Sequence, residues 1–247
     1  MGGRFASEYA IISLFLLFFG IQPVFALTYY SDRSSFNAAY PGLPIEDFEE
    51  GILGPFNVSI GFEPPLDINT NNGVFVPGDI LNGVSFNTTL PPLPPPANEQ
   101  FQVFGSGFIP GVTSKSLVDT ADASGGTALV VDFLGTGIPA AGFDFYVYLS
   151  QYLVSAPTHM SVFGSGYVLL GETAVTSSDS TPVFFGVASS SDMIKRINIL
   201  GDYPGYYEWE GIDNVTFNAP AIPEPTTILL ISSGLIGLAG LKRKLKR

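Results

Sequence analysis

The chain has 247 residues, of which 46% are hydrophobic, and its 10 basic and 22 acidic side chains give a formal net charge of −12 at pH 7. We exclude nucleic acid as a partner, because phosphate contacts require clustered Lys and Arg side chains. The chain has no cysteine and one histidine, His159. Thiolate catalysis and metal sites built from several histidines are therefore excluded as well.

The first 26 residues have the three parts of a secretory signal peptide. Arg4 supplies the positive charge, residues 10–20 form an almost unbroken apolar run, and residues 24–26 precede the expected cleavage point. We expect export across the inner membrane by the Sec machinery, followed by removal of this segment. Glu8 partly offsets the charge of Arg4, so an uncleaved N-terminal anchor is the alternative.

Residues 27–222 form the body of the protein, which is long enough for one domain with a sizeable core. Only four of the 10 basic residues lie in the body, because Arg4 and five tail residues lie outside it. The body holds 20 of the 22 acidic residues, so its formal charge is −16. Such an acidic surface favours solubility first and cation binding second. Without disulfides, the fold must be stabilised by its packed core, with bound ions as a further source of stability.

The body consists of short apolar runs separated by turn residues, a pattern that predicts β-strands. One helix is expected over residues 33–40, with Asp32 or Ser31 as its N-cap and residues 41–42 as its end. Over residues 142–149, apolar side chains alternate with one aspartate and two tyrosines, which predicts a strand with two different faces. The other expected strands are residues 45–49, 58–62, 74–76, 84–88, 128–133, 159–163, 167–173, 183–188, 194–200 and 212–217. This series predicts an all-β fold, an antiparallel β-sandwich.

Aromatic and acidic side chains alternate near the end of the body. In an extended chain, Tyr207 and Trp209 share one face, and Glu208 and Glu210 share the other. Aromatic rings stack on sugar rings, and carboxylates accept hydrogen bonds from sugar hydroxyls, so these four residues are candidate glycan ligands. Two alternatives remain open. The aromatic pair belongs to the core, or the two glutamates are the carboxylate pair of a glycosidase.

Three features follow one another at the C-terminus: Pro223, Glu224 and Pro225, then an uncharged apolar run over residues 226–241, then a basic end over residues 242–247, in which five of the six residues are Lys or Arg. As a helix, the apolar run would span roughly 24 Å, against about 30 Å for the hydrocarbon core of a bilayer. The long side chains of the basic end extend this reach. We expect a single transmembrane helix with its basic end in the cytoplasm.

This order of features resembles the C-terminal sorting signal of PEP-CTERM proteins, bacterial exported proteins that are processed by a membrane enzyme called exosortase. The resemblance covers residues 223–247. It implies transient anchoring, cleavage near Pro223, Glu224 and Pro225, and delivery to the cell surface or extracellular matrix. An ordinary single-pass anchor is the alternative.

The body itself resembles the jelly-roll β-sandwich common among PEP-CTERM proteins. The residues that carry this resemblance are 47–49 (Asp-Phe-Glu) near its start and 212–215 (Ile-Asp-Asn-Val) near its end. In the carbohydrate-binding jelly rolls that the body resembles, a structural calcium can sit between the first and last strands. The resemblance therefore makes Glu49 and Asp213 candidate calcium ligands. The alternative is that Asp213 and Asn214 only close a turn, and no other cofactor is expected.

Together these observations predict a signal peptide (1–26), a β-sandwich domain (27–222) and a sorting signal (223–247). The protein is expected to be a non-enzymatic component of the cell surface or extracellular matrix, with exosortase as a partner. Its body is expected to be structural or to bind extracellular polysaccharide. The alternative is a polysaccharide-active, glycosidase-like enzyme that carries the same signal. Such an enzyme would show a deep cleft and would lose activity when one carboxylate is replaced by an amide.

Overall fold

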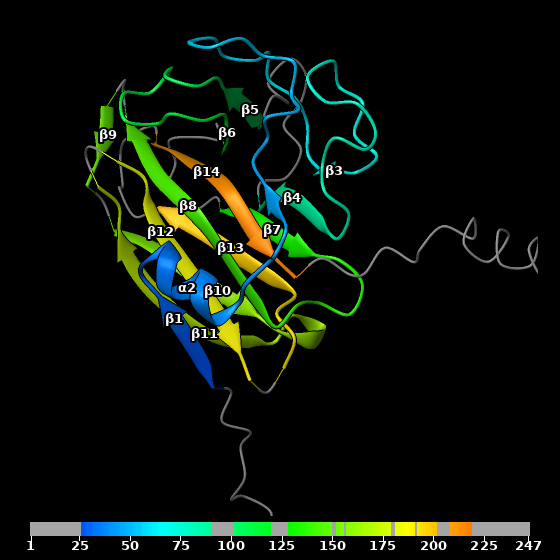
Figure 1. Ribbon diagram of the computed structural model, residues 1–247, viewed down its shortest axis with the longest axis vertical. Coiled ribbons are helices and arrows are strands. Elements are labelled where there is room, and N and C mark those ends of the chain that lie inside the picture. Colours follow the sequence, from blue (N-terminus) through cyan, green and yellow to red (C-terminus); the bar gives the residue numbers. More distant parts are fainter. Residues whose placement is uncertain are drawn as a thin grey trace, which may run out of the picture.

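The computed structural model is all-β apart from one α-helix and one short 3-10 helix among the described residues, and its strands form two antiparallel sheets (Figure 1). The described residues are 26–89, 101–119, 128–149, 152–155, 157–178, 181–190, 192–201 and 208–218. Residues 1–25 of the predicted signal peptide and the whole of the predicted transmembrane segment lie outside them. Within these ranges, no helix has both the length and the apolar character needed to cross a membrane.

The first sheet has eight strands, and its centre is the long pair β8 and β14. The order along the sheet is β1 (Leu27–Tyr30), β12 (Val183–Ser189), β8 (Ala140–Leu149), β14 (Glu208–Phe217), β6 (Ser116–Asp119) and β5 (Phe101–Phe104). Two short strands lie off this path, β2 (Ile45–Glu46) beside β14 and β9 (Tyr152–Val154) beside β8.

The second sheet has six strands. Their order is β11 (Leu169–Thr176), β10 (Pro157–Phe163), β13 (Arg196–Gly201), β7 (Leu129–Phe133), β4 (Val84–Thr88) and β3 (Leu66–Asp67). The chain connects β10 to β11 through the 3-10 helix Ser165–Tyr167. The predicted antiparallel sandwich is thus confirmed at the level of two facing sheets, whereas its jelly-roll type stays a prediction.

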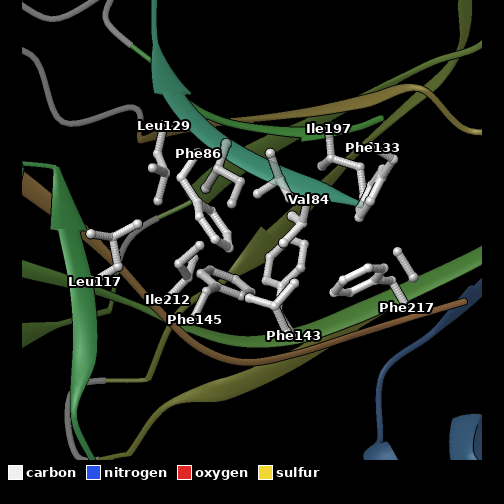
Figure 2. Close-up of a cluster of buried hydrophobic side chains, with 14 of the residues drawn as sticks. Val84, Phe86, Leu117, Leu129, Phe133, Phe143, Phe145, Ile197, Ile212 and Phe217 are labelled. Atoms are coloured by element: carbon white, nitrogen blue, oxygen red, sulfur yellow. The ribbon is translucent and has the colours of Figure 1, made fainter. Parts of the chain in front are cut away.

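The core lies between the two sheets and is rich in phenylalanine. Figure 2 shows side chains of the two sheets that point toward one another. Those labelled are Val84, Phe86, Leu129, Phe133 and Ile197 from the six-stranded sheet, and Leu117, Phe143, Phe145, Ile212 and Phe217 from the eight-stranded sheet. The alternation predicted over residues 142–149 is confirmed, because Phe143 and Phe145 face this core while Asp144 lies on the opposite face.

The opposite face of the eight-stranded sheet is also covered, by two smaller apolar clusters. At one end, Phe36 of α2 (Arg33–Ala39) packs against Phe184 and is fully buried. At the other end, Ile109 and Val112 pack against a cluster that includes Tyr146. The central strands are therefore enclosed on both faces, and the polar groups between the two clusters require partners within the protein.

Helix α2 begins where the sequence predicts, because the side chain of Asp32 accepts a hydrogen bond of 2.8 Å from the backbone N–H of Ser35. The expected strand over 45–49 is wrong beyond Glu46. Phe48 has a φ of 57°, and its N–H donates to the Glu46 carboxylate instead of to a neighbouring strand. Strands β1, β3, β5, β6 and β9 are not among those expected from the sequence.

A prediction concerns Gly211 of β14, which lies directly beneath the ring of Tyr146. A Cβ at this position would approach Cζ of Tyr146 to 2.1 Å, and the ring is fixed by a hydrogen bond of 2.7 Å between its hydroxyl and that of Ser116. We expect Gly211→Ala to lower the free energy of unfolding by about 1–3 kcal/mol, measured by urea denaturation. Gly54→Ala is the control, because its Cβ would meet only the end of the Asn57 side chain. Equal urea midpoints for the two variants would contradict this packing.

Candidate functional site

The start and the end of the body lie side by side, next to the polar groups between the two apolar clusters on the outer face of the eight-stranded sheet. Strand β2 pairs with β14, with Glu46 opposite Val215. This pairing brings residues 47–49 close to residues 212–215, the two motifs that carried the resemblance in the sequence. Acidic side chains from both ends of the domain thus lie in one region, as the calcium hypothesis requires.

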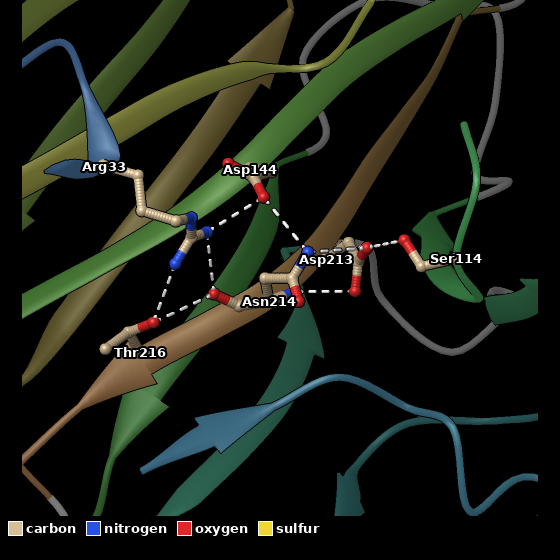
Figure 3. A network of polar contacts seen from close by, with 6 residues as sticks. All are labelled: Arg33, Ser114, Asp144, Asp213, Asn214 and Thr216. Atoms are coloured by element: carbon tan, nitrogen blue, oxygen red, sulfur yellow. Dashed lines mark hydrogen bonds and ion pairs between the residues drawn. The ribbon is translucent and has the colours of Figure 1, made fainter. Parts of the chain in front are cut away.

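Arg33 connects the helix to the two central strands (Figure 3). Its guanidinium forms an ion pair of 2.9 Å with the Asp144 carboxylate of β8. It also donates hydrogen bonds to the backbone oxygen of Asn214, at 3.1 Å, and to the hydroxyl of Thr216, at 2.9 Å, both in β14. A planar fork of donors suits such a set of acceptors at fixed positions.

Asn214 lies where the pairing of β14 with β8 shifts register, between Asp213 and Thr216. Its φ is 52°, a left-handed conformation that asparagine adopts more readily than most residues. Its side-chain amide donates to Asp144, at 3.1 Å, and to Asp213, at 2.9 Å. The amide therefore bridges two carboxylates that would otherwise repel each other across the strand pair (Figure 3).

Two carboxylates of this region are almost completely buried. Asp213 is 3% exposed and accepts hydrogen bonds from the Ser114 hydroxyl and from the Asn214 backbone, and burial raises its pKa to about 7, with a further contribution from the negative charge of Asp144. Glu46 is 2% exposed and accepts from the backbone of Phe48 and Leu81; burial also raises its pKa to about 7. Backbone donors lower the pKa of both groups, and the Ser114 hydroxyl also lowers that of Asp213, but these hydrogen bonds do not offset the loss of water.

The two predicted calcium ligands have protein partners. The Glu49 carboxylate accepts a hydrogen bond of 2.8 Å from the N–H of Lys115 and lies 3.4 Å from its ammonium nitrogen. The Asp213 carboxylate accepts a hydrogen bond from the hydroxyl of Ser114, which precedes Lys115 in the chain. Both acids thus contact the segment that leads into β6, but each already has donors there. The structural calcium stays a prediction.

A different set of acids converges more closely. Ligand oxygens of Glu46, Asp47 and Glu50 lie within 4.8 Å of one another. Reasoning from the sequence did not single out this trio, although the run of four acids around Phe48 is visible there. What brings the trio together is the left-handed turn at Phe48, which the sequence pattern does not indicate.

Of the four predicted glycan ligands, the structure describes the side chains of Trp209 and Glu210. Tyr207 and the side chain of Glu208 lie outside the described residues. Trp209 is half-buried in the outer cluster, with its ring centroid 5.4 Å from that of Tyr148 and 5.8 Å from that of Phe104. Glu210 is 3% exposed and accepts a hydrogen bond of 2.9 Å from the backbone of Gly201. Its expected role as a surface acceptor for sugar hydroxyls needs correction, because its carboxylate has no access to a ligand on the surface.

Comparison with known families identifies the C-terminal segment. Residues 221–244 match the family model of the PEP-CTERM protein-sorting motif, so the chain carries this motif. The match includes Pro223, Glu224 and Pro225, which lie outside the described residues. No curated protein matches the chain.

Solved structures resemble the body only distantly. A mutant family 29 carbohydrate-binding module complexed with cellulohexaose has 15% identity and a TM-score of 0.36, and the match covers 66% of this chain and 92% of that chain. A module from Clostridium stercorarium in complex with cellobiose has 16% identity and a TM-score of 0.29, with 49% of this chain and 83% of that chain covered. A likeness of this degree carries no argument about what the present chain binds.

The two buried carboxylates predict a pH dependence of stability. A carboxyl group whose pKa is higher in the folded than in the unfolded state binds extra protons on folding, so its contribution to stability is lost as pH rises through the folded pKa. Since Glu46 and Asp213 both have pKa values of about 7 in the fold, we expect the free energy of unfolding to fall between about pH 5 and about pH 8. Urea denaturation at several pH values in this range measures the free energy of unfolding.

Asp213→Asn removes one of the two contributions and should reduce this pH slope by about half. The slope is the informative quantity, because the substitution also changes hydrogen bonds with Ser114 and Asn214. Glu172→Gln, on the exposed edge strand β11, is the control and should leave the slope unchanged. A stability that rises between these pH values, or a slope that Asp213→Asn does not alter, would contradict the prediction.

Proposed function

We propose that the protein is exported, anchored only transiently through its C-terminal segment, processed by exosortase, and then released to the cell surface or extracellular matrix. The observation that carries this proposal is the sorting motif matched at residues 221–244. Its Pro-Glu-Pro sequence precedes an uncharged apolar run and a basic end, the order expected for a segment that is first inserted in a membrane and then cut from the body.

The position of the motif relative to the fold supports such processing. The last strand, β14, ends at Phe217, which is fully buried, and the matched segment begins at residue 221. The packed sandwich is thus complete before the motif starts. Cleavage near residues 223–225 would remove no strand and no core side chain from the described body.

We further propose that the body is a non-enzymatic glycan-binding sandwich. Support comes from a cleft of about 360 Å³ on the outer face of the six-stranded sheet, lined by Tyr167 together with Asp132 and Asn87. An exposed aromatic ring beside hydrogen-bonding side chains is the combination that recognises sugars.

The same cleft disfavours the glycosidase alternative. A glycosidase needs two carboxyl groups on opposite sides of the bond that is cut. Among the described residues, Asp132 is the one acid that lines this cleft, and both of its oxygens accept hydrogen bonds from Arg196. The described lining of the cleft therefore lacks the second carboxyl group that this reaction requires.

Processing is tested by the mass of the mature protein recovered from producing cells. We expect the wild-type chain to lack its basic end, residues 242–247, and to leave the membrane fraction. A variant with Pro223, Glu224 and Pro225 all replaced by alanine should keep this tail and stay in the membrane fraction, because the extended segment that a processing enzyme grips is lost. A wild-type protein that retains Arg247 in a stably inserted form would overturn the sorting proposal.

Glycan binding is tested with the full-length chain on an array of extracellular polysaccharides and their oligosaccharides. The chain should be purified in a zwitterionic detergent, because detergents with sugar head groups would compete for the cleft. We expect saturable binding to at least one glycan and no release of shortened products. Hydrolysis of a bound glycan would instead support the enzyme, and absence of binding across the array would overturn the glycan-binding proposal.

A further inference from the structure

The cleft is built on a row of paired residues across three neighbouring strands. Ser85 of β4 lies opposite Asp132 of β7, and Asp132 lies opposite Arg196 of β13. Their neighbours in sequence, such as Phe86, Val131 and Ile197, point into the core, so the row faces outward. Strand pairing thus places a hydroxyl, a carboxylate and a guanidinium side by side at fixed spacing on the outer face.

The row is cross-linked by side-chain hydrogen bonds. Arg196 donates to the two oxygens of Asp132 at 2.7 and 2.9 Å, a bidentate arrangement with defined geometry. The side-chain amide of Asn87 donates to Asp132 at 3.1 Å and to the hydroxyl of Ser85 at 3.3 Å. The polar floor of the cleft is therefore ordered before a ligand arrives, which reduces the entropy lost on binding.

Tyr167 forms an aromatic wall of this cleft. The guanidinium of Arg196 lies 4.6 Å from the centroid of its ring and covers one face, while 58% of the residue remains exposed. Its φ of 57° reflects the tight connection between β10 and β11. That connection is fixed by Asp192, whose carboxylate accepts hydrogen bonds from the backbone N–H and the hydroxyl of Ser165, at 3.0 and 2.8 Å.

Charge at the cleft differs from charge on the rest of the body. The body has four basic residues; Arg33 and Lys115 belong to the polar region described above, and the other two, Lys195 and Arg196, are adjacent here. Arg196 is neutralised by Asp132, whereas the ammonium of Lys195 donates to the backbone oxygen of Gly135, a neutral group. Lys195 lines the cleft, so its remaining N–H donors can reach a ligand, while its charge also acts on the nearby carboxylate of Asp192.

We propose that this cleft binds a saccharide unit that carries a carboxylate, that is, a uronic acid residue of an extracellular polysaccharide. The inference rests on the glycan-binding function proposed above and specifies its ligand. The sugar ring stacks on the open face of Tyr167, its hydroxyls bond to Asn87 and Asp132, and its carboxylate pairs with Lys195. Repulsion by the more distant acids of the body is screened beyond about 8 Å at physiological ionic strength. Within the cleft, Asp132 is paired with Arg196, which leaves the ammonium of Lys195 as the cation that faces the ligand carboxylate.

The test measures binding of the full-length chain, in zwitterionic detergent, to uronate oligosaccharides and to the same oligosaccharides with their carboxylates reduced to alcohols. We expect the wild type to prefer the uronate forms. Tyr167→Asn removes the ring but suits the left-handed backbone, and should weaken binding of both forms by about tenfold. Lys195→Met should weaken only the uronate forms, by about tenfold, and so abolish the preference.

Three control variants separate these roles from a general loss of structure. Tyr167→Phe keeps the ring and Lys195→Arg keeps the charge, so both should bind as the wild type does. Phe56→Asn is matched to Tyr167→Asn, because Phe56 is 73% exposed and has a φ of 60° but lies outside the cleft. It should bind normally. Equal thermal melting midpoints across the set show that each variant is folded.

Each contrary result has a distinct meaning. If the wild type binds glycans and Tyr167→Asn and Lys195→Met bind equally well, the cleft is not the site, although the glycan-binding function stands. If the wild type prefers the reduced oligosaccharides, the inferred acidic ligand is wrong. If the wild type binds neither form nor any glycan on the array, the proposed function fails together with this inference.

Discussion

The ion pair between Arg33 and Asp144 is the contact on which the organisation of this body depends. The eight-stranded sheet is covered on both faces, so the carboxylates of its central strands have restricted access to water: the side chain of Asp144 is 25% exposed, and Asp213 is 3% exposed. Arg33 supplies a compensating charge from α2 and also binds the backbone of β14 at Asn214. A single guanidinium thus connects the helix and the two longest strands (Figure 3). Without it, Asp144 would be an uncompensated charge beside Asp213, which is energetically costly.

The four basic residues of the body divide between two regions with different surroundings. Arg33 and Lys115 serve acids that connect the two ends of the domain, where their side chains are 25% and 13% exposed. Arg196 orders the outer face of the other sheet, and the neighbouring Lys195 lines an open cleft. In a body with a formal charge of −16, such placement is informative. With 20 acidic and four basic residues in the body, most acidic groups cannot each have a basic partner of their own. Among the described residues, Arg33, Lys115 and Arg196 each form an ion pair with an acid.

Features set by neighbours along the chain were predictable from the sequence. Asp32 caps α2 because an N-cap requires only a short side chain with an acceptor oxygen, placed three residues before a backbone N–H that has no partner within the helix. Phe143 and Phe145 face the core because successive side chains of a strand point to opposite faces. The strand over 45–49 was only partly predicted, since the turn at Phe48 depends on the buried Glu46 carboxylate, which also binds Leu81 from a distant loop. The C-terminal motif needs no fold, because its order of residues is itself the signal that is matched.

The tertiary structure decided which of these side chains are accessible to a ligand. Trp209 and Glu210 alternate as the sequence implies, yet both faces of β14 are covered, so Trp209 packs in a cluster and Glu210 is buried. Conversely, Asp132 and Arg196 are 64 positions apart and meet only because β7 and β13 are neighbours in the sheet. The sequence by itself determined the strand pattern, the acidic charge and the sorting motif, since these are local or additive properties. Strand order and the covering of each face are collective properties of the folded chain, and they alone determined which side chains are buried and which line an open cleft.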